Sequence, residues 1–116
     1  MRSSGDSNLL GQSMGIGMQV VFVGFARSFA LESEASVRLI RLSRFSQRVG
    51  DCTLTIEALT AVQGPGPACY HVRLDLVARD GVIVLGTPCA SHEPASAIDA
   101  AFNAAEVSLG SVDYAP

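Results

Sequence analysis

The chain has 116 residues, of which 48% are apolar and 16% are charged, and its formal net charge at neutral pH is −3. This length and composition predict one globular domain with a single modest core, and they argue against a disordered chain. The acidic balance argues against a general nucleic-acid binder, because such proteins are more often basic overall.

The distribution of charge along the chain is more informative than its sum. All eight basic side chains are arginine, because the sequence contains no lysine. Residues 27–48 carry five arginines and two glutamates, a net charge of +3, whereas residues 49–116 carry two arginines and eight acids, a net charge of −6. The positive charge is therefore concentrated in one segment of an acidic protein.

The three cysteines, Cys52, Cys69 and Cys89, are widely spaced and odd in number. This usage argues against a disulfide framework and predicts a reducing, cytoplasmic location. No apolar run approaches the ~20 residues that a membrane-spanning helix needs. The N-terminus is a poor signal peptide, since no continuous apolar stretch follows Arg2.

The N-terminal residues are rich in Gly and Ser and show no periodicity. We therefore predict a flexible extension over 1–17, a single domain over 18–112 and a short tail over 113–116. Met14 and Met18 each offer an alternative start of the chain. The β-branched and aromatic run 18–25, which Gly24 interrupts near its end, predicts the first strand.

A helix is predicted from Ser28, as its N-cap, to about residue 45, with Glu32 and Glu34 near the start, where the helix dipole favours anions. One apolar stripe at helical spacing predicts its buried face. Ile40 points away from this stripe, and Gly50 is predicted to end the element. The stripe consists of Leu31, Ala35, Leu39, Leu42, Phe45 and Val49.

Residues 52–59 alternate between apolar and polar side chains and predict a second strand, followed by a Gly-Pro loop over 60–68. The clearest alternation is YHVRLDLVA over 70–78, which predicts a half-buried third strand. The turn signal at 79–81 and the apolar run 82–85 then predict a hairpin with a fourth strand. The apolar face of strand three would carry Tyr70, Val72, Leu74 and Leu76, and its polar face His71, Arg73 and Asp75.

A loop is predicted over 86–93, followed by a helix that begins at Pro94 and ends at Gly110. The order β-α-β-β-β-α predicts an α+β fold, a two-layer sandwich of a four-stranded sheet with two helices on one face. Strands two to four are expected to form an antiparallel meander, with strand one alongside. The buried face of the second helix would carry Ile98, Ala101, Phe102, Ala105 and Leu109.

Four stretches in this order match the pattern of a known family. They are MQVVFVG at 18–24, LSRF at 42–45 with Arg48 and Val49 beyond it, YHVRLDLVARDG at 70–81, and AIDAAF at 97–102. Together they resemble the ribosome hibernation promoting factor family, also called the sigma-54 modulation or ribosome-associated inhibitor family. The resemblance covers residues 18 to about 109, and it rests on order and spacing rather than on any single motif.

The resemblance implies a double-stranded-RNA-binding-like fold and a bacterial, non-enzymatic factor of the stress response. Such a factor silences idle ribosomes by binding the small ribosomal subunit and its rRNA in the channel for mRNA and tRNA. The family's second helix is usually rich in Lys and Arg, whereas AIDAAFNAAEVSLG at 97–110 contains neither. A diverged member that acts as a protein–protein interaction module with weakened RNA binding is therefore the alternative function.

The candidate RNA-binding residues are four arginines of the first helix and its end, together with two residues of strand three. Guanidinium groups grip phosphate bidentately, and the arginines fall on an arc beside the apolar stripe. From the residues alone, the favoured interpretation of these arginines is an ordinary solvated helix face. With the family resemblance added, RNA contact becomes the favoured interpretation. For the strand residues, RNA contact and an ordinary exposed strand face are equally supported. These residues are Arg38, Arg41, Arg44 and Arg48, with His71 and Arg73.

The sequence also contains residue types suited to two other kinds of site. Cys69, His71, Cys89 and His92 have side chains suited to zinc and would meet at the base of the hairpin, but their spacing matches no standard zinc finger. We therefore expect neither a metal nor another cofactor. No phosphate loop, nucleophile motif or paired-carboxylate signature is present, so an enzyme is not expected. A membrane or DNA partner is also not expected, and the choice between monomer and homodimer stays open.

Overall fold

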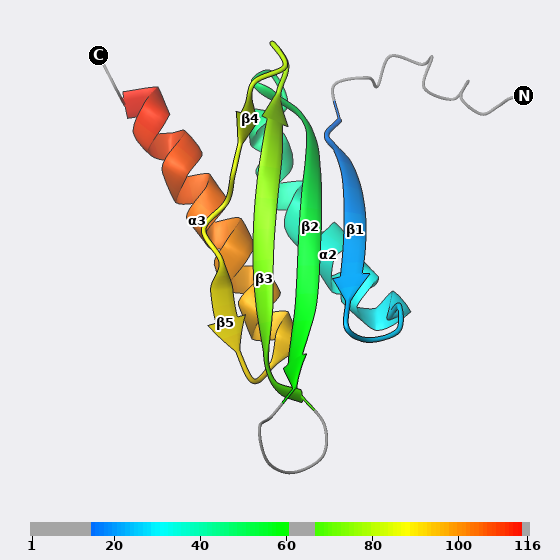
Figure 1. The fold of residues 1–116 in the computed structure, drawn as a ribbon. Helices are drawn as coiled ribbons and strands as arrows, with labels where there is room; N and C mark the ends of the chain where they lie inside the picture. The colour runs from blue at the N-terminus through cyan, green and yellow to red at the C-terminus, as the bar shows by residue number, and fades with distance from the viewer. Residues whose placement is uncertain (1–14, 61–66, 115–116) are drawn as a thin grey trace, which may run out of the picture.

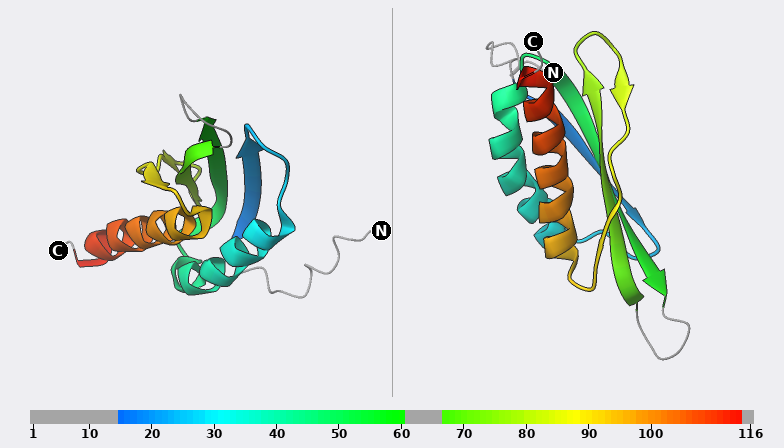
Figure 2. Two further views of the ribbon diagram at one scale, coloured as in Figure 1. Left: turned by 90° about the horizontal axis from the view of Figure 1, so that it is seen from below. Right: turned by 90° about the vertical axis from the view of Figure 1, so that its left-hand side faces the viewer.

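The computed structural model describes residues 15–60 and 67–114. Over these residues one sheet is backed by two helices (Figure 1), and both helices lie on the same side of it (Figure 2). The predicted two-layer α+β fold is therefore confirmed. The elements are β1 (Gly17–Val23), α2 (Phe29–Leu42), the 3-10 helix η2 (Ser43–Phe45), β2 (Val49–Thr60), β3 (Pro67–Ala78), β4 (Ile83–Val84), β5 (Cys89–Ser91) and α3 (Pro94–Tyr114).

The strand order in the sheet is β1-β2-β3-β4, and β5 also pairs with β3. The β1–β2 pair is parallel, because α2 carries the chain back across the sheet, and the other pairs are antiparallel. β4 and β5 thus follow one another along a single edge of β3. The segment 86–93 was predicted as a loop, but it contains β5, a strand whose three residues are too few to give a period-two signal.

The two faces of β3 are those that the alternation predicts. Val72, Leu74 and Leu76 are buried beneath the helices, whereas His71 and Arg73 are exposed on the open face. Across the β2–β3 register Leu74 lies opposite Leu54, another buried leucine. The apolar face of the sheet and the predicted faces of both helices therefore form one continuous core.

The start of α2 is confirmed, because the Ser28 side chain accepts a hydrogen bond from the Leu31 amide at 3.2 Å. Its end differs from the prediction. The helix stops at Leu42, a 3-10 helix and a turn follow, and Gly50 lies inside β2. The apolar stripe continued to Phe45 and Val49 because both are buried in the same core after the helix has ended.

The end of α3 also differs from the prediction. The helix passes through Gly110 and continues to Tyr114. A glycine ends a helix when it adopts a left-handed conformation, and among the described glycines only Gly24 and Gly81 have positive φ. At the other terminus Ile16 is buried in the core and Gly17 begins β1. Residues 1–14 of the predicted extension lie outside the described residues, as do 115–116.

Within the described ranges, neither helix is long and apolar enough to span a membrane.

Gly86 is a residue where the fold tolerates no side chain. A Cβ at this position would lie 2.0 Å from the Leu74 carbonyl oxygen, and the Gly86 amide donates a hydrogen bond to Asp75 Oδ1 at 2.7 Å. Gly86→Ala is expected to lower the free energy of unfolding by about 1–3 kcal/mol or more, because the clash is with backbone. Urea denaturation measures this loss.

A Cβ at Gly110 meets nothing within 4 Å, so Gly110→Ala is the control and should stabilise the helix by about 0.5–1 kcal/mol. Equal effects at the two glycines would contradict the close approach at Gly86.

Candidate functional site

The four candidate arginines of α2 and its following turn all reach towards α3. We call Arg38, Arg41, Arg44 and Arg48 the arginine seam. Arg38, Arg41 and Arg44 are spaced by three, so they follow one side of α2 and its 3-10 extension. On α3 their partners Asp99, Asn103 and Glu106 are spaced by four and three, so they also form one stripe. The two stripes meet between the helices.

Each member of the arginine seam has a defined contact. Arg38 Nε lies 2.9 Å from Asp99 Oδ1, and Arg38 Nη2 lies 3.4 Å from Glu34 Oε2. Arg41 Nη2 lies 3.2 Å from both Asn103 Oδ1 and Glu106 Oε1. The seam is thus held by side chains of both helices.

The other two arginines of the seam contact α3 and Phe45. Arg44 Nη2 lies 3.6 Å from Glu106 Oε1, and Arg48 Nη2 donates to the Leu109 carbonyl at 2.9 Å. The guanidinium carbons of Arg44 and Arg48 lie 4.8 Å and 5.2 Å from the centre of the Phe45 ring. Cation–π contact of this kind contributes about 0.5–1 kcal/mol at exposed sites and orients the two side chains.

Much of the positive charge of the seam is balanced by neighbouring acids. Arg38 is paired with Glu34 and Asp99, and Arg41 and Arg44 share Glu106. The exposed fractions decide which groups an external anion can reach. The side chains of Arg41 and Arg44 are 56% and 65% exposed, whereas that of Arg38 is 24% exposed. Arg41 and Arg44 are therefore the accessible cations of the seam.

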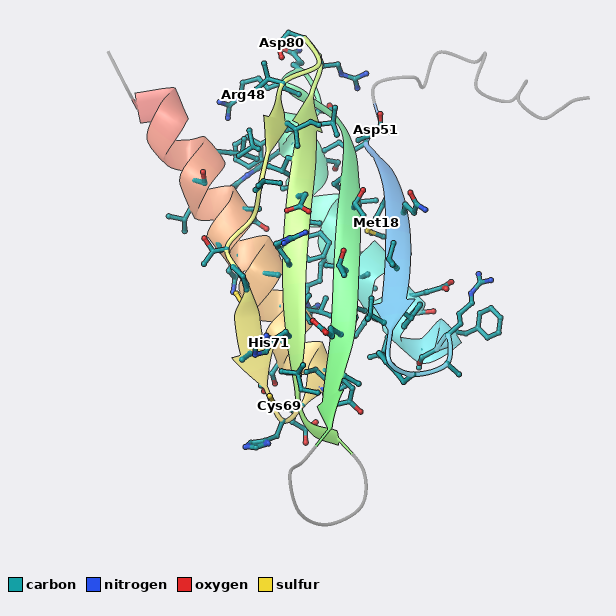
Figure 3. The ribbon with its side chains drawn as sticks, viewed as in Figure 1. Met18, Arg48, Asp51, Cys69, His71 and Asp80 are labelled. Carbon is teal, nitrogen blue, oxygen red and sulfur yellow. The ribbon has the colours of Figure 1, made fainter. Side chains whose placement is uncertain are left out.

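The other two candidate RNA-binding residues lie elsewhere. His71 and Arg73 belong to the open face of β3, the side of the sheet away from both helices, so the structure does not bring them together with the seam. Figure 3 places His71 towards the β5 end of the molecule and Arg48 near the hairpin tip at Asp80. Arg73 is paired with Asp75, whose carboxylate lies 3.1 Å from its Nε. The open face is thus a surface separate from the arginine seam, and its arginine is already paired with an acid.

The hairpin base does not assemble the four residues considered for zinc. His71 lies opposite Ala90, and Cys89 lies opposite Val72. A shift of one residue in register moves a side chain to the other face of the sheet, so Cys89 faces the core while His71 faces outward. In the parts of the chain that the structure covers, no three His, Cys, Asp or Glu residues are placed to hold a metal ion together.

Cys52 is a core residue with an unreactive thiol. It is 2% exposed, and burial, with a smaller contribution from the Asp51 charge, raises its pKa to about 12. The thiolate is the form that reacts, so alkylation of Cys52 by iodoacetamide at pH 8 should be far slower in the folded than in the urea-unfolded protein. Peptide mass spectrometry at successive times measures both rates. Equal labelling in the two states would contradict the burial.

Sequence reasoning identified the arginines but missed their partners. Asp99, Asn103 and Glu106 carried a readable signal, because their spacing puts them on one stripe beside the apolar face of the second helix. That stripe was not matched against the arginine arc of the first helix. The match required knowing that the two helices lie side by side with these faces in contact.

No protein-family model matches the sequence, and no curated protein is significantly similar to it. Solved structures do share its fold. One is a ribosomal subunit interface protein from Coxiella burnetii, with a TM-score of 0.71, 13% sequence identity, and coverage of 86% of this chain and 100% of that chain. Another is the N-terminal domain of Protein Y from Thermus thermophilus, with a TM-score of 0.65, 13% identity, and coverage of 84% and 98%. Both belong to the hibernation promoting factor family, so the predicted resemblance is confirmed at the level of the fold.

Proposed function

We propose that this chain is a bacterial, cytoplasmic, non-enzymatic factor that binds the small ribosomal subunit through its rRNA and inhibits translation. The observation that carries the proposal is the fold over nearly the whole described chain, which it shares with a ribosomal subunit interface protein. The arginine seam supports it further, because Arg41 and Arg44 present guanidinium groups to solvent on the helical face. Phosphate contacts of this kind require neither a metal nor a cofactor.

In this proposal the single domain of residues 18–112 is the ribosome-binding unit. Arg41 and Arg44 make the principal phosphate contacts, and Arg38 and Arg48 support them from the ends of the seam. His71 and Arg73 lie on the opposite side of the sheet, so a second RNA segment would be needed to reach them.

Sedimentation with purified ribosomes at low salt tests the proposed function. The full chain should migrate with the small subunit in a sucrose gradient at roughly 50 mM salt, where phosphate contacts are strong. It should also inhibit translation of a reporter mRNA in a cell-free system. A chain that remains at the top of the gradient under these conditions contradicts ribosome binding.

A second candidate function is a protein–protein interaction module. This alternative arises because residues 97–110 of α3 contain no Lys or Arg that could contact RNA. Exposed apolar side chains on the helices favour it, since Val37, Ile40 and Val107 are 55%, 72% and 68% exposed. Exposed apolar side chains on helices whose arginines are paired with acids are more typical of a protein surface than of an RNA surface. A chain that fails to sediment with ribosomes at low salt supports this function in place of the first.

A further inference from the structure

Among the acids whose side chains the structure describes, Glu106 stands out because it is 9% exposed and bridges two cations. Its Oε1 lies 3.2 Å from Arg41 Nη2 and 3.6 Å from Arg44 Nη2. Its other oxygen, Oε2, is buried and has no hydrogen-bond partner within the described residues. Two guanidiniums of successive turns therefore converge on a single anionic oxygen.

This convergence is the arrangement that binds a phosphate oxygen. Guanidinium N–H groups donate to carboxylate and phosphate in the same fork geometry. An N–H group that points at Glu106 is not available to a phosphate at the same time. The carboxylate thus holds the position that a phosphate would take between Arg41 and Arg44.

The two sides of this contact differ in their freedom to move. The side chains of Arg41 and Arg44 are more than half exposed and can turn outward, whereas the Glu106 side chain is 10% exposed and is held within the helix layer. A phosphate that draws both arginines away would leave Glu106 as a buried, uncompensated anion, which is an unfavourable state. Breaking the internal ion pairs therefore reduces the net free energy of phosphate binding.

We propose that Glu106 is an internal competitor for phosphate that lowers the affinity of the arginine seam for RNA. The inference rests on the proposed function and adds a determinant of how tightly and how reversibly the site binds. Removing the negative charge of Glu106 should make Arg41 and Arg44 available to phosphate without the breaking of an ion pair. Binding should then be tighter and should show the salt dependence of one further phosphate contact.

The test compares Glu106→Gln with the unmodified full chain. Glutamine keeps the length of the side chain and an oxygen acceptor while it removes the charge. The probes are purified small ribosomal subunits and a short RNA duplex, each titrated at several salt concentrations. The variant should bind about tenfold more tightly, as the loss of two ion pairs with exposed arginines implies, and the salt slope should steepen by about one unit.

The matched control is Glu57→Gln, which changes the net charge equally. Glu57 lies on the open face of β2 in register with His71, away from the helices. This control should leave the affinity nearly unchanged. An equal gain in both variants would show an effect of net charge alone and would overturn the inference. Replacing Arg41 and Arg44 by glutamine in the Glu106→Gln background should abolish the gain, and a gain that persists would also overturn it.

A converse variant keeps the inference testable if Glu106→Gln does not fold. Asn103 is exposed, and its Oδ1 already lies 3.2 Å from Arg41 Nη2. Asn103→Asp places a second carboxylate against Arg41 and should weaken RNA binding several-fold. Gln19→Glu on β1, which adds the same charge to the open face, is its control and should not. Unchanged binding by Asn103→Asp overturns the inference.

The outcomes also separate this inference from the proposed function. Binding by the unmodified chain that neither Glu106→Gln nor Asn103→Asp alters removes the competitor and leaves the ribosome-binding function in place. Absence of binding by both the unmodified chain and Glu106→Gln at low salt overturns both. Binding by Glu106→Gln alone supports the competitor and overturns the proposed function of the unmodified chain, which would then not bind ribosomes by itself.

Discussion

Leu74→Ala is expected to lower the free energy of unfolding by about 2–5 kcal/mol, the range for truncating a fully buried leucine. Leu74 is 2% exposed, lies at the middle of β3, and faces both Leu54 and the helices. Alanine would leave a cavity that β2 and α3 cannot close without moving. Urea denaturation followed by circular dichroism measures the loss.

The matched control for this truncation is Ile83→Ala on the neighbouring strand β4. Ile83 is 64% exposed although it is equally apolar. Its truncation should change stability by no more than about 0.5 kcal/mol, as surface substitutions usually do. A loss below ~1 kcal/mol at Leu74 would mean that the two faces of β3 are the reverse of those assigned.

The sequence was sufficient to predict the fold because most of its signals are local. The alternation of residues 70–78 determined which side of β3 is buried, and Ser28 predicted the start of α2. The failures share one cause, which is that a local signal acquires its meaning from tertiary contacts. Gly110 predicted a helix end, but glycine ends a helix only if the backbone turns there, and at Gly110 it does not. β5 was missed because three residues form a strand only through pairing with β3.

The candidate site was predictable to a smaller extent, for a related reason. The arginine arc is a property of one helix and was visible in the sequence. Its electrostatic character is a property of two helices in contact, since Asp99 and Glu106 neutralise arginines more than sixty residues away along the chain. Sequence periodicity gives the face on which a side chain lies, and it does not give which other face that side chain meets.

RNA binding through the arginine seam should depend strongly on salt. Each phosphate that an arginine neutralises releases condensed counterions, and the logarithm of the binding constant falls with the logarithm of the salt concentration. With about four such contacts, affinity should fall ~100-fold between roughly 50 and 200 mM salt. Titration of small subunits at four or more salt concentrations gives the slope.

Replacing Arg41 and Arg44 by glutamine should weaken binding further and flatten this slope by about one unit for each lost contact. The pair is the natural choice, because these are the exposed members of the seam. Their removal alone would leave Glu106 buried without a counter-charge, which is destabilising. The decisive variant therefore adds Glu106→Gln, so that residues 41, 44 and 106 are all neutral. Any loss of binding is then separated from a loss of stability.

Arg27→Gln provides the control for charge, since Arg27 is an exposed arginine that precedes α2 and pairs with Glu32 rather than with α3. It should reduce affinity only slightly and leave the slope nearly unchanged. The neutral triple variant should remain folded, with a melting temperature close to that of the unmodified chain, yet lose binding at about 50 mM salt, where the Arg27→Gln protein still binds. A folded triple variant that sediments with the small subunit as well as the unmodified chain does would remove the arginine seam from the interface. The open face with His71 and Arg73 would then be the remaining candidate for RNA contact.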